Sequence, residues 1–130
     1  MNRKLLFVGT GIFVLLFLFS CKKSPDGPTD IRIRNKSGVV YKNVNVDTSG
    51  GEHNYGDVNP GGETEYYRFD IAYREAHITL DINNVQYEFI PVDYTYEVPL
   101  GQGKFTYELS IADTAEHLLA IHVIADAPLK

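Results

Sequence analysis

The sequence predicts an all-β fold, and three features of the chain indicate it. Apolar and polar residues alternate along most of the chain after residue 30, which is the period of strands with one buried face. Turn-forming glycines, prolines and asparagines interrupt the alternation about every 8 to 14 residues, as in an antiparallel sandwich. Nine tyrosines and seven phenylalanines favour strands over helices. We therefore expect residues 31–130 to form one antiparallel β-sandwich domain.

The first half of this domain is expected to hold three strands. Ile31 and Ile33 alternate with two arginines and form the core face of the first strand. The residues on one face of the second expected strand are Val40, Lys42, Val44 and Val46, of which the last two are expected in the core. The third strand, 63–70, is rich in tyrosine and its register stays open. Turns rich in glycine and asparagine separate these strands at 35–38, 47–51 and 59–62.

The second half predicts a hairpin and a long strand. Residues 78–82 and 85–89 both alternate, and the Asn-Asn pair between them matches two-residue hairpin turns whose residues have positive φ. Residues 104–111 alternate throughout and form the clearest strand.

The final segment, 116–124, has two interpretations. Asp113, followed three residues later by a glutamate, matches a helix capping box. Alternation of apolar residues favours a strand instead, and these residues are Leu119, Ile121 and Val123. Taken together, the segments predict an immunoglobulin-like or transthyretin-like sandwich of about seven or eight strands, after an N-terminal signal peptide.

The first 21 residues have the features of a secretory leader. Arg3 and Lys4 form a basic head, 5–19 is an almost continuous apolar run, and the small residue Ser20 precedes Cys21. The run of about 15 residues is shorter than the roughly 20 that a membrane-spanning helix needs. An uncleaved membrane-anchor helix with a buried cysteine is the alternative interpretation.

This leader resembles a bacterial lipoprotein signal peptide. Leu18 and Ser20 stand where that family has an aliphatic and a small residue, whereas Phe19 is larger than the residue usual at its position. The resemblance implies that the chain is cut between Ser20 and Cys21, that the Cys21 thiol receives a diacylglycerol, and that the new amino terminus is acylated. Attachment to the lipid bilayer would then be stable, because two acyl chains suffice for stable anchoring.

The residues that follow the leader predict a flexible tether at 21–30. This segment contains two prolines and a glycine and has no apolar side chain after its cysteine. Cys21 is the only cysteine of the chain, so we expect no disulfide framework and no cysteine metal site. Loss of residues 1–20 removes two of the 12 basic side chains and none of the 17 acidic ones, giving a formal net charge of −7. That balance argues against nucleic acid as a partner.

Three short motifs of the domain resemble small β-sandwich lipoproteins of Gram-negative envelopes. They are the Ile-x-Ile-x-Asn start, the Pro-Gly-Gly turn before the tyrosine-rich strand, and the Gly-x-Phe-Thr-Tyr strand. The resemblance covers the whole mature chain and implies a lipid-anchored domain of the cell envelope, at the outer membrane, facing the periplasm or the exterior. It carries over no active site.

No catalytic motif is present in the sequence. The chain has no G-x-S-x-G, no Walker loop and no H-E-x-x-H, and its four histidines are scattered. We therefore expect a non-enzymatic binding or structural module without a cofactor or metal. The alternative is a small hydrolytic or metal-dependent envelope enzyme, whose pocket would gather His77, Asp81 or the acidic loop 47–57.

Three tyrosines are the candidate ligand-binding residues. Tyr94 and Tyr96 share one face of an extended segment, and Tyr66 from another strand could join them. Such an aromatic platform would suit a sugar or a peptide, so a protein or a glycan is the expected partner. Packing within strands, where tyrosine is common, is the alternative.

Overall fold

The computed structural model describes residues 27–93 and 97–127, and this part of the chain is all-β. Its strands are β1 (Thr29–Asn35), β2 (Lys42–Asp47), β3 (Glu52–Asn54), β4 (Tyr67–Phe69), β5 (His77–Ile82), β6 (Val85–Phe89), β7 (Gly103–Asp113) and β8 (Leu118–Ala127). The all-β class and the expected number of strands are confirmed. Within these ranges no helix is long and apolar enough to cross a membrane.

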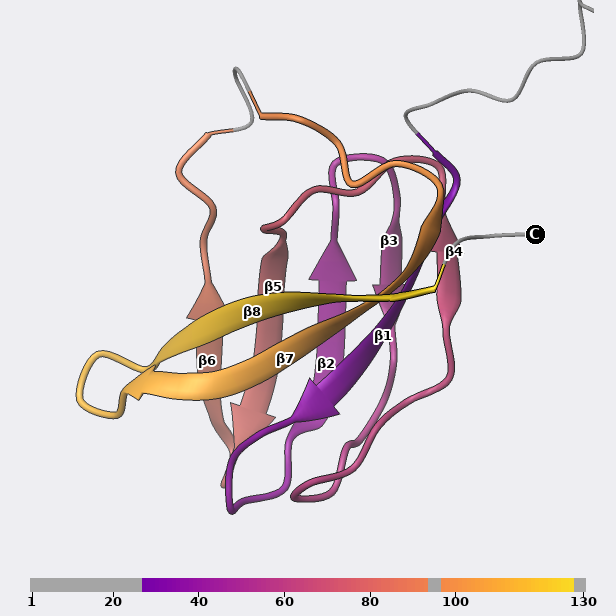
Figure 1. Ribbon diagram of the computed structural model, residues 1–130. Coiled ribbons are helices and arrows are strands. Elements are labelled where there is room, and N and C mark those ends of the chain that lie inside the picture. The colour runs from indigo at the N-terminus through magenta and orange to yellow at the C-terminus, as the bar shows by residue number, and fades with distance from the viewer. Residues whose placement is uncertain (1–26, 94–96, 128–130) are drawn as a thin grey trace, which may run out of the picture.

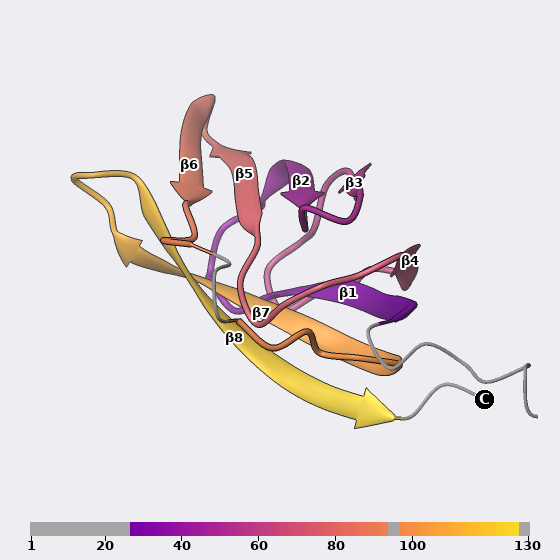
Figure 2. The same ribbon diagram turned by 90° about the horizontal axis from the view of Figure 1, so that it is seen from above.

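The eight strands form one sheet that folds over into two layers (Figures 1 and 2). One layer contains β3, β2, β5 and β6, the other contains β8, β7, β1 and β4, and the core lies between them. The layers join where β6 meets β8 at the single pair Glu88–Leu118. At the opposite edges the His53 ring of β3 stacks on the Tyr67 ring of β4, with centroids 3.7 Å apart. The domain is therefore almost a closed barrel.

Most neighbouring strands pair antiparallel, as the sequence predicts, but two pairs are parallel. The pairing of β1 with β7 is parallel and runs from Thr29–Gly103 to Asn35–Leu109. The short contact of β6 with β8 is also parallel. In sheet order β1 lies between β7 and β4, so the beginning of the domain is joined to its last hairpin.

The core is one cluster of apolar side chains from both layers. Its fully buried members include Ile31, Ile33, Tyr41, Val44, Val46, Ile78, Tyr107 and Leu109. Core positions expected for the first two strands, Val44 and Val46 among them, are confirmed. The first strand also begins earlier than expected, since Thr29 and Asp30 belong to β1 and are buried.

The prediction that Val40 lies on the core face is wrong, because β2 has a bulge near its start. The alternation places Val40 and Lys42 on the core face, yet Tyr41 is fully buried and Val40 is 39% exposed. The pairing of β2 with β5 shifts register between Lys42 and Asn45, and Asn43 has φ of 52°. An extra residue in one strand reverses the faces of the residues before it, so Tyr41 and not Val40 points into the core.

The predicted Asn-Asn turn and the residues read as a helix capping box both lie in hairpin turns. Asn83 and Asn84 have φ of 51° and 66°, as the turn between β5 and β6 requires. Asp113 Oδ1 accepts hydrogen bonds from the amides of Ala115, at 2.9 Å, and Glu116, at 3.1 Å. The capping signal therefore stabilises the β7–β8 turn, and the final segment is a strand.

Candidate functional site

The two ends of the sandwich carry different features. The described chain begins at Gly27 at one end, and β1 then runs to the other end, where it stops at Asn35 (Figure 1). At about 3.3 Å per residue, the seven residues of β1 span about 23 Å. The turns that follow β1 and β5 therefore lie at the end remote from Gly27.

A hollow of about 540 Å³ lies at this remote end, and we call it the distal hollow. Three separate parts of the chain line it: the segment after β1, the loop between β3 and β4, and the hairpin turn between β5 and β6. The lining residues are Gly38, Val39, Val40, Lys42, Pro60, Asn83 and Asn84. Its volume falls within the range of about 300–1,000 Å³ that small-molecule sites occupy.

A buried asparagine fixes the shape of the hollow. Asn35 is fully buried, and its Nδ2 donates to the carbonyl oxygens of Val39, at 2.7 Å, and Val58, at 3.0 Å. Its Oδ1 accepts from the amide of Ser37 at 2.8 Å, and its backbone bonds Gly61 and Gly62. Asn35 thus fastens the turn after β1 to the loop before β4. The Asn-Lys-Ser-Gly sequence marked a turn, but nothing in it indicated this bridge.

The lining of the distal hollow combines apolar and polar groups. Val39 and Val40 are 36% and 39% exposed and supply apolar surface. The amides of Asn83 and Asn84 and the ammonium of Lys42 can hydrogen-bond hydroxyl or peptide groups. None of the seven lining side chains is a carboxylate, histidine, serine or cysteine. This chemistry suits the binding of a polar molecule with apolar faces, such as a sugar or a peptide.

Tyr66, one of the predicted ligand-binding residues, lies within a polar network beside β1 and β7. Its hydroxyl donates to Asp126 Oδ2 at 2.8 Å, and this oxygen also accepts from the Thr106 hydroxyl at 2.6 Å. Arg32 Cζ and Lys104 Nζ lie 5.0 Å and 5.2 Å from the ring centroid. Burial, and then the bond to Asp126, raises the pKa of Tyr66. The ring therefore already contacts two cations of its own chain.

A second cluster of charges fastens the segment before β4 to the sheet. Arg34 donates to Glu63 Oε2 at 2.8 Å and to Glu108 Oε2 at 2.7 Å. Arg32 Nη2 also lies 3.0 Å from Glu63 Oε2. The bonds to Glu108 and then Glu63 raise the pKa of Arg34. These contacts join a loop to β1 and β7, so we assign them a structural role.

Among the residues that an enzyme would need to gather, His77 pairs with Glu88, whereas Asp81 and Asp57 share Asn43 as their partner. His77 Nε2 lies 3.1 Å from Glu88 Oε2, whereas Asp81 Oδ2 accepts from Asn43 at 3.4 Å. Asp57, from the acidic loop, accepts from the backbone amide of Asn43. In residues 27–93 and 97–127, no three carboxylate, histidine or cysteine side chains group so that they could hold a metal ion.

The remaining predicted site residues lie outside the described part of the chain. The leader, residues 1–20, and the cleavage and lipidation sites at Ser20 and Cys21 are among them. Tyr94 and Tyr96 are outside it as well. Lipidation and the tyrosine platform therefore stay predictions.

Comparison with known proteins supports the fold. No protein-family model matches the chain, and no curated protein matches it either. It is similar to a solved structure described as the NMR structure of the protein from Eubacterium rectale, with a TM-score of 0.54 and 14% sequence identity. The match covers 77% of this chain and 93% of that one. At 14% identity this similarity shows the fold alone. The fold and the site together define the protein as a small all-β domain with a hollow at one end.

Proposed function

We propose that this chain is a lipoprotein of the cell envelope, anchored in the outer membrane through an acylated Cys21. Its sandwich is a non-enzymatic module that presents the distal hollow to a protein or glycan partner. The observation that carries this proposal is that Gly27, which lies within the predicted tether 21–30, and the turns that line the distal hollow are at opposite ends of the domain (Figure 1).

Chain lengths support this arrangement. The six residues from Cys21 to Gly27 extend at most about 20 Å, so the anchored domain stays close to its membrane. Strand β1 then places the hollow about 23 Å further along the domain. When the Gly27 end of the domain faces the membrane, a partner approaching from outside the lipid surface meets the hollow first.

The chemistry of the hollow supports binding and not catalysis. Its amides, single ammonium and two valines can bind hydroxyl, peptide and apolar groups, but they provide no pair of groups for proton transfer. The negative net charge makes nucleic acid an unsuitable partner. A glycan or a peptide segment of an envelope protein fits this lining.

The anchor can be tested by metabolic labelling. Cells that express the protein are grown with a clickable palmitate analogue, beside cells that express Cys21→Ala. The wild-type protein should carry the label and its mature form should begin at Cys21, whereas the variant should carry none. Equal labelling of both, or a mature protein with a free thiol, would refute the anchor.

The binding role of the hollow can be tested with two matched variants. A partner is first captured by crosslinking on cells, identified by mass spectrometry, and then purified for direct binding measurements. Val40→Asp places a charge in the hollow, and Leu118→Asp places one on a similarly exposed side chain outside its lining. We expect Val40→Asp to lose binding and Leu118→Asp to keep it. Equal affinity of the two variants would contradict the assignment.

A further inference from the structure

The loop between β6 and β7 carries unusually exposed apolar side chains. Ile90, Val98 and Val92 are 63%, 77% and 97% exposed, the highest values among the large apolar residues that the structure describes. Single exposed apolar residues are common on protein surfaces, but three on one loop indicate a contact surface. We call these three residues the proximal patch.

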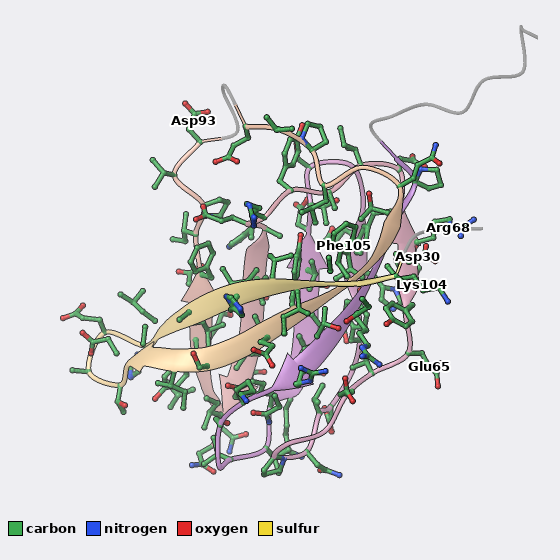
Figure 3. All side chains as sticks on the ribbon, viewed as in Figure 1. Asp30, Glu65, Arg68, Asp93, Lys104 and Phe105 are labelled. Carbon is green, nitrogen blue, oxygen red and sulfur yellow. The ribbon has the colours of Figure 1, made fainter. Side chains whose placement is uncertain are left out.

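The proximal patch lies at the end of the domain where the described chain begins. Asp93, next to Val92, is at this end, opposite the turns that form the distal hollow (Figure 3). Hydrogen bonds hold the end of the loop to the first residues that the structure describes. Gln102 Nε2 donates to the Gly27 carbonyl at 3.2 Å, and the Thr29 hydroxyl donates to the Gly101 carbonyl at 2.6 Å.

We infer that the proximal patch enters the interface of the lipid bilayer and gives the domain a second membrane contact. This inference rests on the proposed anchor, because Cys21 lies at most about 20 Å of extended chain from Gly27. An anchored domain therefore keeps this end near the lipid. Aliphatic side chains so placed leave water when they enter the bilayer interface, which is favourable.

The charge of the loop indicates which lipids suit this contact. Asp93 and Glu97 lie between Val92 and Val98 in the sequence, and both are exposed. Anionic headgroups would repel them, so attraction by charge does not drive the contact. Insertion should therefore be stronger into zwitterionic phosphatidylcholine than into a bilayer rich in anionic lipid.

A second membrane contact would also orient the domain. A flexible tether alone lets the sandwich rotate above the membrane, whereas contact at both the tether and the loop fixes one end against the lipid. Since the distal hollow is at the other end, its mouth would then face away from the membrane. The patch thus serves the proposed binding role.

Tryptophan reporters test the inference, since the chain has no native tryptophan. Val92→Trp places a reporter in the patch, and Val85→Trp, on a valine that is 39% exposed beside the hairpin turn of the hollow, is the matched control. Each full-length variant, as purified from membranes, is reconstituted on phosphatidylcholine vesicles with or without brominated acyl chains. Emission on vesicles is measured on the vesicle-bound fraction recovered by flotation, and emission without vesicles is measured over a range of protein concentrations.

We expect the Val92→Trp emission to shift to the blue on vesicles and to lose intensity with brominated chains, while the Val85→Trp emission does neither. Equal behaviour of the two reporters, or a failure of the protein to float, would overturn the inference. A blue shift of Val92→Trp that depends on protein concentration and not on vesicles would also overturn it, because a second copy would then cover the patch. The mass of Cys21 in the same samples reports on the anchor separately.

Discussion

Replacement of Asn35 by alanine tests whether this one side chain holds the distal hollow together. Asn35 is fully buried and joins the turn after β1 to the loop before β4. Asn35→Ala removes both donor bonds and the acceptor for the Ser37 amide and the Ser37 hydroxyl. The turn would lose its attachment to the loop, so the hollow should lose its shape along with part of the stability of the domain.

The size of the effect follows from what the freed groups can bind instead. The Val58 carbonyl keeps its bond from the Tyr41 amide, and Val39 is exposed enough for water to replace Asn35. No carbonyl is therefore left buried without a partner. The loss is then the net contribution of four hydrogen bonds, about 0.5–1.5 kcal/mol each, or about 2–6 kcal/mol in total.

Urea unfolding followed by tyrosine fluorescence measures this loss. Asn45→Ala is the matched control, because the Asn45 amide donates to Glu52 at 2.7 Å on the exposed face of the sheet. That variant should lose less than about 0.5 kcal/mol, as is usual for surface substitutions. If Asn35→Ala were no less stable than Asn45→Ala, the buried bridge would not support the hollow as we argue.

Three further predictions concern pH and backbone conformation. Burial lowers the pKa of His53 below its ordinary 6.5, so the folded state binds fewer protons than the unfolded state near that pH. The free energy of unfolding should therefore fall as the pH drops through 6.5. Urea titrations of His53→Phe should no longer show this pH dependence. Burial raises the pKa of the Tyr55 hydroxyl, which donates to the Ile31 carbonyl at 2.6 Å. The contribution of the protonated Tyr55 hydroxyl to the free energy of unfolding is complete below pH 10 and should be lost above it. The variant Tyr55→Phe should therefore lose less stability at alkaline pH in the same assay. Asn43 has φ of 52°, so Asn43→Val should lower the free energy of unfolding by about 1–2 kcal/mol in urea titrations. Glycine adopts this backbone without strain, so Asn43→Gly should not show this loss. Equal losses in the two variants would show that the bulge is not strained.

Alternation of residues predicted the strands well because it reports directly which side chains face the core. Strands β5, β6 and β7 follow the expected segments, and the Asn83-Asn84 turn has the expected φ values. Alternation does not report which strands are neighbours. The parallel pairing of β1 with β7 depends on contacts between residues more than 70 positions apart, so no local pattern could reveal it.

The site was less accessible to prediction than the fold. The distal hollow is lined by three turns that are far apart in sequence, and each resembles an ordinary surface turn by itself. Their proximity follows from the strand order, which the sequence did not disclose. Of the three tyrosines predicted to bind a ligand, Tyr66 binds Asp126 within its own domain, whereas Tyr94 and Tyr96 lie outside the described residues.

The failure of the alternation at Val40 explains why the hollow has an apolar wall. Had β2 been regular, Val40 would point into the core and Tyr41 would lie on the surface. The bulge at Asn43 buries Tyr41, whose hydroxyl donates to the Leu109 carbonyl at 3.0 Å, and leaves Val40 beside Val39 at the rim. Asparagine tolerates this backbone better than most residues. A local departure from the strand pattern thus moves apolar surface from the core to the proposed binding site, where departures from folding rules are expected.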